Sequence, residues 1–320
     1  MAAPEFICAG MIVADVLVEG FEAIPRAGET ARVSGVSLAA GGDASNEAIA
    51  LAKLGNRVGL MGLIGDDAQG RMIAADCARR GIATDGLSVD PDRPTTTGVV
   101  LIERGGERSF LSPANGTIGA LGPEHIDLGL IRPGLRALSI GSLFTAARFD
   151  LEAVTPLLRR AKEVGAITIA DMVMDQRGYG LDDLASAWPH LDYVVPSALE
   201  AELFTGLTEP RAIAARFREL GVRNVVLKRG AAGAIAFVGE TEVTCPAFDV
   251  PVADTTGAGD NFVGGLVHAL VKGFPIDQAL RFASAVAALS VQAVGAGAGL
   301  RDLAQVEEFL ARTAEPATLP

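Results

Sequence analysis

The stretch DTTGAGDNF, residues 254–262, places two threonines, two glycines and two carboxylates directly before an apolar segment. Asp and Thr are favoured at helix N-caps, and glycines allow the backbone to approach a ligand closely. The apolar side chains that follow recur at helical spacing: Phe262, Val263, Leu266, Val267 and Leu270. We therefore expect a helix to begin here, with unpaired N–H groups and the positive end of its dipole at residues 257–260.

A helix N-terminus of this kind binds anions, and Asp260 places a carboxylate inside it. One interpretation is structural: the helix is simply capped, and Asp260 interacts with its dipole. The other is catalytic and suits phosphoryl transfer. The N–H groups of Gly257, Ala258 and Gly259 would hold the charge of the moving phosphoryl group, and Asp260 would accept the proton of the attacking hydroxyl. This stretch alone leaves both open.

Upstream of residue 254, short apolar runs alternate with segments of helical spacing. Strands are expected at 6–13, 58–64, 137–140, 166–170, 193–195, 225–227 and 234–238, and helices at 44–54, 68–80, 151–164 and 211–220. This alternation predicts an α/β fold with crossover connections, a mostly parallel central sheet and helices on both faces. After residue 257 two long helical patterns follow each other, interrupted at 273–275, and a last helix is expected at 303–312.

Two segments break the alternation. Residues 16–38 mix polar and apolar side chains around Pro25, and residues 95–111 read as a β-hairpin that turns at Gly105-Gly106. We expect both to form a small β-sheet that projects from the body; two separate surface hairpins are the alternative. Since the chain shows no internal repeat and no low-complexity linker, we predict one domain, 1–320, with this sheet as a discontinuous lid.

Composition and missing motifs narrow the classes of function. The 320 residues carry a net charge of -12, which disfavours nucleic acid and anionic membrane as partners. Three scattered cysteines, no signal peptide and no apolar run of membrane-spanning length predict a cytoplasmic location. No Gly-Lys-[Ser/Thr] loop, no GxSxG elbow, no GxGxxG after the first strand and no metal-ligand spacing of histidines occurs.

The stretch DTTGAGDNF resembles the C-terminal signature of the ribokinase-like, PfkB-type carbohydrate kinases. Their N-terminal signature resembles AGGDASNEAIALAKLG, residues 40–55, which VGLMGLIGDDAQG follows. The likeness runs from ICAGMIVADV to ALSVQAVGAGAG and thus covers nearly the whole chain; it is strongest to bacterial sugar kinases with a GGDAxNEA form of the first signature. It implies a ribokinase-like fold and transfer of the γ-phosphoryl group of ATP, with Mg²⁺, to a sugar hydroxyl.

The resemblance also implies roles for individual residues. By position, Asp260 is the catalytic base, and Gly257, Ala258 and Gly259 form the anion hole. The implied ligands of the sugar, whose hydroxyls need both donors and acceptors, are Asp15 at the end of the first strand, Gly41, Gly42, Asp43, Asn46, Arg108 in the lid hairpin and Asn115. Structural alternatives exist for most of them: a strand-end turn, a tight turn before a helix, a helix-surface amide or a solvated arginine.

The nucleotide side rests on two further likenesses. VVPSALEAE resembles the family's Asn-x-x-Glu segment, with Ser197 in place of the usual Asn and Glu200 matching the acid that organises Mg²⁺ and phosphates through water. VVLKRGAAG resembles the loop that places Lys228 and Gly230 near the ATP phosphates, beside Gly257 and Gly259; a solvated strand-end lysine is the alternative. Asp254 and VGAGAG, residues 294–299, resemble regions that bind a monovalent cation such as K⁺ in some members.

The resulting prediction is a cytoplasmic, ATP-dependent sugar kinase that forms a homodimer through the lid, as the resemblance implies. A nucleoside kinase of the same family is one alternative, but only 5% of residues are aromatic, and Phe110 and Phe144 are the candidates to stack a base. A non-catalytic protein that senses sugars or nucleotides is another. The complete GAGD run with Asp260 argues against it.

Overall fold

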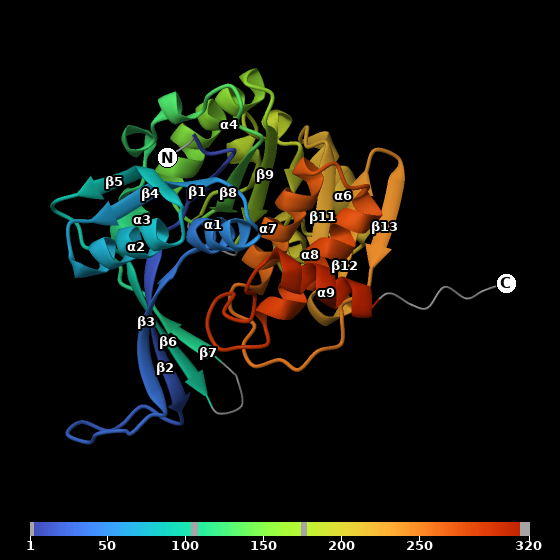
Figure 1. Ribbon diagram of the computed structural model, residues 1–320. Coiled ribbons are helices and arrows are strands. Elements are labelled where there is room, and N and C mark those ends of the chain that lie inside the picture. Colours follow the sequence, from blue (N-terminus) through green and yellow to red (C-terminus); the bar gives the residue numbers. More distant parts are fainter. Residues whose placement is uncertain (1–2, 104–107, 174–177, 314–320) are drawn as a thin grey trace.

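The computed structural model describes residues 3–103, 108–173 and 178–313, and a nine-stranded sheet forms the body of this part of the chain (Figure 1). The strands of this sheet are β1 Phe6–Gly10, β4 Val58–Gly65, β5 Ala83–Asp90, β8 Ala137–Leu143, β9 Ile167–Met172, β10 Tyr193–Val194, β11 Asn224–Lys228, β12 Ala234–Val238 and β13 Thr241–Cys245. The α-helices are α1 Asp43–Lys53, α2 Ala68–Arg79, α3 Thr117–Ala120, α4 Val154–Glu163, α5 Ala198–Thr205, α6 Pro210–Glu219, α7 Ala258–Val271, α8 Ile276–Ser290 and α9 Leu303–Arg312.

The strand order is β13-β12-β11-β10-β9-β8-β1-β4-β5. All neighbours from β11 to β5 pair in parallel, whereas β12 and β13 are antiparallel. The predicted mostly parallel α/β sheet is therefore confirmed. Chain order reverses around β1, which lies between β8 and β4. Open parallel sheets bind ligands at the carboxyl ends of their strands near such a reversal.

Helices cover both faces because side chains alternate across each strand. On β1, Phe6 and Cys8 pack into a core with α1, α7 and α8, while Ile7 and Ala9 pack into a second core with α4 and α6. Figure 1 shows α7, α8 and α9 grouped on one side of the sheet. The site residues on α1 and α7 thus belong to one layer.

Several predicted boundaries are wrong. The strand expected at 6–13 ends at Gly10, whose φ of 137° and close approach to Gly141 redirect the chain, and a new strand begins at Val13. The helix expected at 151–164 starts with a π-helical turn, Phe149–Ala153, before α4. β5, β13 and α5 were not predicted. The break at 273–275 and the helix at 303–312 are confirmed.

The two unusual segments form one four-stranded sheet, in the order β3-β2-β6-β7, which projects from the body (Figure 1). Its strands are β2 Val13–Phe21, β3 Gly35–Gly41, β6 Thr97–Glu103 and β7 Arg108–Leu111. β2 and β6 pair in parallel, so the two segments share a ladder and are not separate hairpins. The turn predicted at Gly105-Gly106 lies outside the described residues.

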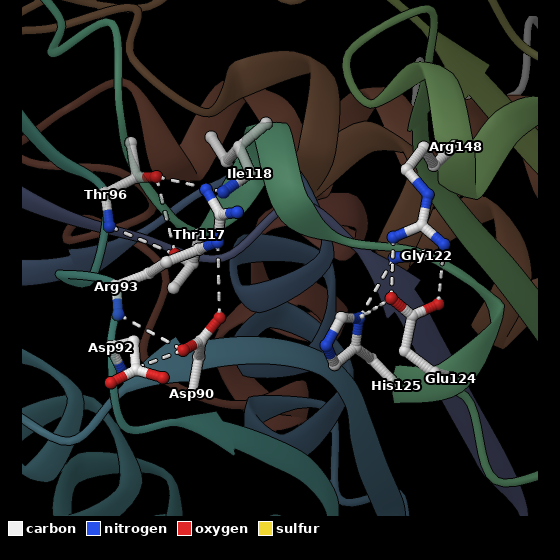
Figure 2. Close-up of polar contacts among 10 residues, drawn as sticks. All are labelled: Asp90, Asp92, Arg93, Thr96, Thr117, Ile118, Gly122, Glu124, His125 and Arg148. Atoms are coloured by element: carbon white, nitrogen blue, oxygen red, sulfur yellow. Dashed lines mark hydrogen bonds and ion pairs between the residues drawn. The ribbon is translucent and has the colours of Figure 1, made fainter.

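Polar contacts fasten this smaller sheet to the body (Figure 2). The Thr96 amide, just before β6, donates to the Thr117 hydroxyl at 3.1 Å, and the Ile118 amide donates to the Thr96 hydroxyl at 3.0 Å. Both ends of the β6–β7 hairpin are thereby held together at its base. Over the described ranges, no helix combines the length and apolar character needed to cross a membrane.

Candidate active site

The N-terminus of α7 lies where the sequence predicted it. Gly257 is the N-cap residue and has a φ of 69°, in the left-handed region that favours glycine. A Cβ there would also lie 2.9 Å from the Cβ of Ala296, so the position has no room for a side chain. The N–H groups of a first helical turn have no partners within the helix and favour anions; at the start of α7 the Ala258 amide donates to the carbonyl oxygen of Thr255 at 3.2 Å.

Asp260 stands in this first turn, and its side chain is buried, with 7% exposed. Its Oδ2 accepts a hydrogen bond of 2.7 Å from Nδ2 of Asn46 on α1. Burial raises the pKa of Asp260 to about 7; the Asn46 bond opposes the rise and the nearby Asp171 carboxylate adds to it. A carboxylate with a pKa near neutrality is well matched to accept a proton.

The first turn of α1 brings further carboxylates to the same place. Asp43 contacts the hydroxyl of Ser142, a buried residue near the end of β8 with a φ of 67°. Burial and the Asp260 charge raise the pKa of Asp43, and burial raises that of the fully buried Glu47 one turn further on. Asn46 and Asp43 therefore lie together at Asp260, as the resemblance implied.

Lys228 at the end of β11 forms a buried ion pair with Asp171 at the end of β9. Burial acts to lower the pKa of Lys228, but the Asp171 and Glu200 carboxylates outweigh it and hold that pKa above its ordinary value. A Cβ built on Gly259 would lie 3.2 Å from the Lys228 ammonium. The ammonium thus stands beside the first turn of α7, and the solvated strand-end alternative is wrong.

A cavity of about 500 Å³ opens next to Lys228 and the first turn of α7. Its lining is mainly apolar and includes Phe248, Val250, Val252, Ala287, Ala288 and Val291. Lys228, Gly230, Ala258 and Gly259 also line it. An apolar pocket that includes an ammonium and a helix N-terminus suits a ligand with an aromatic base and a polyphosphate.

Ser197 and Glu200 form a capping box at the N-terminus of α5. The Glu200 amide donates to Oγ of Ser197 at 3.2 Å, and the Ser197 amide donates to Oε2 of Glu200 at 2.7 Å. Residue 197 forms an isolated parallel bridge with Lys228, so α5 starts beside the ion pair. Their roles toward phosphate and Mg²⁺ remain predictions.

The prediction that Asp15 ends the first strand is wrong: Asp15 lies inside β2 of the smaller sheet. Burial raises its pKa to about 6. A Cβ on Gly41 would lie 1.9 Å from its Oδ2, so a side chain at residue 41 would displace the Asp15 carboxylate. Gly42 is the N-cap of α1. Leu17, on the same face of β2 as Asp15, lies 3.9 Å from where a Cβ of Gly295 would be, so this face is turned toward the body.

Three predicted site residues remain: Arg108, Asn115 and Asp254. The side chain of Arg108 lies outside the described residues. Asn115 is exposed in the connection between β7 and α3. Asp254 accepts bonds from the amide and hydroxyl of Thr256 and, at 2.8 Å, from the amide of Gly295. Its carboxylate therefore ties together the two segments that the resemblance linked to a monovalent cation.

Asp171, Ser142 and Glu47 were missed by sequence reasoning. Asp171 could have been found, because it directly follows a predicted strand at 166–170 and carboxyl ends of parallel strands line such sites. Ser142 lies beyond the predicted end of its strand. Glu47 looks like an ordinary helix glutamate until the packing of α1 is known.

Comparison with known proteins agrees with this geometry. Residues 7–303 match the family described as pfkB family carbohydrate kinase. The chain is 30% identical to probable fructokinase-3 of Arabidopsis thaliana over 82% of this chain and 83% of that one. The structure of Arabidopsis thaliana ribokinase complexed with ribose and ATP is similar with a TM-score of 0.82 and 28% identity, covering 96% of this chain and 99% of that one. A putative ribokinase II from E. coli, in complex with ATP and Mg²⁺, has the same fold, with a TM-score of 0.83, 24% identity and coverage of 97% and 99%.

Proposed function

The chain belongs to the pfkB family of carbohydrate kinases, and on that premise we propose that it transfers the γ-phosphoryl group of ATP to a hydroxyl of a small sugar with Asp260 as the base. The observation that carries this proposal is the placement of Asp260. Its carboxylate is buried in the first turn of α7, oriented by Asn46 and next to the Lys228 ammonium. A dipole partner alone would need neither the burial nor the amide.

The proposed mechanism assigns a separate task to each part of the site. Asp260 accepts the proton of the sugar hydroxyl, and Asn46 keeps the carboxylate in its orientation. The N–H groups after Gly257 and the ammonium of Lys228 stabilise the negative charge of the moving phosphoryl group. The cavity beside them holds the nucleotide. The chain forms one kinase domain, and the smaller sheet is the lid that covers the sugar.

Mg²⁺ fits the donor set on the nucleotide side. This ion usually keeps several waters and is held by one or two carboxylates together with substrate phosphates. Glu200 and Asp171 both act on Lys228 and so supply such carboxylates beside the proposed phosphate site. Glu200 would hold the ion through water, and the bound ion would neutralise phosphate charge. A requirement for K⁺ near Asp254 remains a prediction that activity in potassium and choline salts would test.

Of the two rings that could stack on the base of a nucleoside, one is not available. The Phe144 ring is buried and stacks on Phe204 with ring centroids 4.1 Å apart, so it is not available to a base. Phe110 lies on β7 and is 64% exposed. Sugar-dependent release of ADP over a panel of ketoses, aldoses, sugar acids and nucleosides tests the proposal. Release with a sugar supports it, release with nucleosides alone supports the alternative, and ATP binding without any release would mean a sensor. The cytoplasmic location stays a prediction.

Replacing Asp15 tests the sugar side of the site. We expect Asp15→Ala to raise the KM for the sugar by roughly tenfold or more, because a lost buried hydrogen bond is worth about 1–3 kcal/mol, and to leave the KM for ATP nearly unchanged. Asn46→Ala should raise the sugar KM too and also lower kcat, since Asn46 orients Asp260. Glu19→Ala, on the same face of β2 but further from the body, is the control. An unchanged sugar KM in both variants would reject the assignment.

The outer face of the lid supports a homodimer. Register pairs place seven aliphatic side chains on this face: Val16, Val18, Val36, Leu38, Val99, Leu101 and Leu111. Val36 is 65% exposed, and Leu38 and Leu111 are about half exposed. An exposed apolar sheet face of this kind needs cover, and a second lid would supply it.

We therefore expect a dimer at micromolar concentration and a monomer after Val36→Asp combined with Leu38→Asp. Light scattering coupled to gel filtration measures both states. Val89→Asp, which places the same charge on an exposed valine of β5, should leave the dimer intact. A monomeric unmodified chain would contradict the proposal.

A further inference from the structure

Lys53 lies at the opposite end of α1 from Asp43 and Asn46. Its Nζ donates a hydrogen bond of 2.9 Å to the carbonyl oxygen of Gly297. The segment around Gly297, residues 294–299, consists of Val, Gly and Ala and has no polar side chain with which to fix itself. Lys53 from α1 and Asp254, through the Gly295 amide, hold this segment from two sides.

The same segment packs directly against the proposed anion hole. A Cβ on Gly297, which has a φ of 76°, would lie 2.8 Å from Oδ1 of Asn261. Asn261 in turn donates from Nδ2 to the carbonyl oxygen of Gly257 at 2.7 Å. Gly257 itself leaves no room for a Cβ against Ala296. Gly297, Asn261 and Gly257 are therefore closely packed, and we expect a displacement of Gly297 to shift Gly257 or Asn261.

We propose that Lys53 is a positioning residue for the anion hole: its ammonium holds Gly297 and, through Asn261 and Ala296, fixes Gly257 and the N–H groups that follow it. This inference rests on the proposed function, because the position of those N–H groups affects a rate only if they bind the phosphoryl group. α1 then serves the site from both ends, through Asn46 on Asp260 and through Lys53 on the anion hole.

The test compares Lys53→Met with the unmodified chain in steady-state kinetics. The variant should have a kcat lower by roughly tenfold, with smaller changes in both KM values, because a misplaced catalytic group costs rate more than binding. Lys53→Arg keeps a charged donor for the Gly297 carbonyl and should retain most of the activity. Lys272→Met, at the exposed end of α7, is the matched control and should leave the rate unchanged.

A kcat of Lys53→Met within twofold of that of the unmodified chain would overturn the role of Lys53. A loss of kcat in Lys53→Arg as large as that in the Met variant would overturn it too. If the Met variant does not fold, Lys53→Gln replaces it, and the same loss of kcat is expected. An unmodified chain without any sugar-dependent turnover would contradict the proposed function and this inference together, whereas an active chain whose kcat does not depend on Lys53 contradicts this inference alone.

Discussion

Asp260→Asn is expected to lower kcat by roughly 10²–10⁴, because the amide keeps the size and the bond geometry of the side chain but cannot accept the proton. ATP binding should be unchanged, since the cavity and Lys228 are not altered. If Asp260 only interacts with the helix dipole, the substitution costs under about 1 kcal/mol and activity survives. Initial rates of ADP release at saturating ATP and sugar distinguish the two outcomes.

The stability of the same variant provides its control. The pKa of Asp260 is about 7 in the folded chain, above the ordinary value of 3.8. Since the folded state binds the proton more tightly than the unfolded state, its stability falls as the pH rises from about 4 to about 7 and stays low above that range. The neutral Asn avoids this loss. We expect Asp260→Asn to unfold at an equal or higher temperature than the unmodified chain at about pH 8, so that a lost rate cannot be assigned to unfolding.

Lys228→Met should have the second-largest effect. Removing the ammonium takes a positive charge from the phosphoryl group, and a loss of roughly 10²–10³ in kcat is expected. It also leaves Asp171 as an unpaired buried carboxylate, which costs about 3–5 kcal/mol of stability. Denaturant unfolding and steady-state kinetics measure the two losses separately.

The double variant Lys228→Met with Asp171→Asn separates structure from catalysis. It removes both charges, so we expect most of the lost stability to return. Activity should not return with it, because the phosphoryl group still lacks the ammonium. Recovery of both stability and activity would show that the ion pair only supports the fold.

The sequence predicted the interior of the sheet better than its edges. Strands at 58–64 and 234–238 are continuous apolar runs, as expected for strands buried on both faces. β5 and β13 are the two edge strands of the sheet, and they were not predicted because polar residues interrupt their apolar pattern. The smaller sheet was predicted as a unit from the two segments that did not fit the alternation, but its parallel pairing of β2 with β6 depends on residues far apart in the chain.

In the site, too, features that are local in the sequence were predicted, whereas contacts between distant residues were not. The caps and glycines of residues 254–260 act locally, so their helix start could be predicted from the sequence. The ion pair of Lys228 with Asp171 and the bond from Asn46 to Asp260 join residues far apart in sequence, and only the fold brings them together. The two signatures indicated Asn46 and Asp260 because of a family resemblance. Asp171 belongs to neither signature.

The pH dependence of kcat/KM for the sugar, measured on the unmodified chain at saturating ATP, tests the central claim most directly, because it reports the base without altering it. The carboxylate form of Asp260 accepts the proton, so the rate should fall as the pH drops through a value close to the pKa of about 7. Asp260→Asn should lose this acid limb along with its activity. A rate that stays level from about pH 8 down to about pH 5 would contradict the assignment of Asp260 as the base.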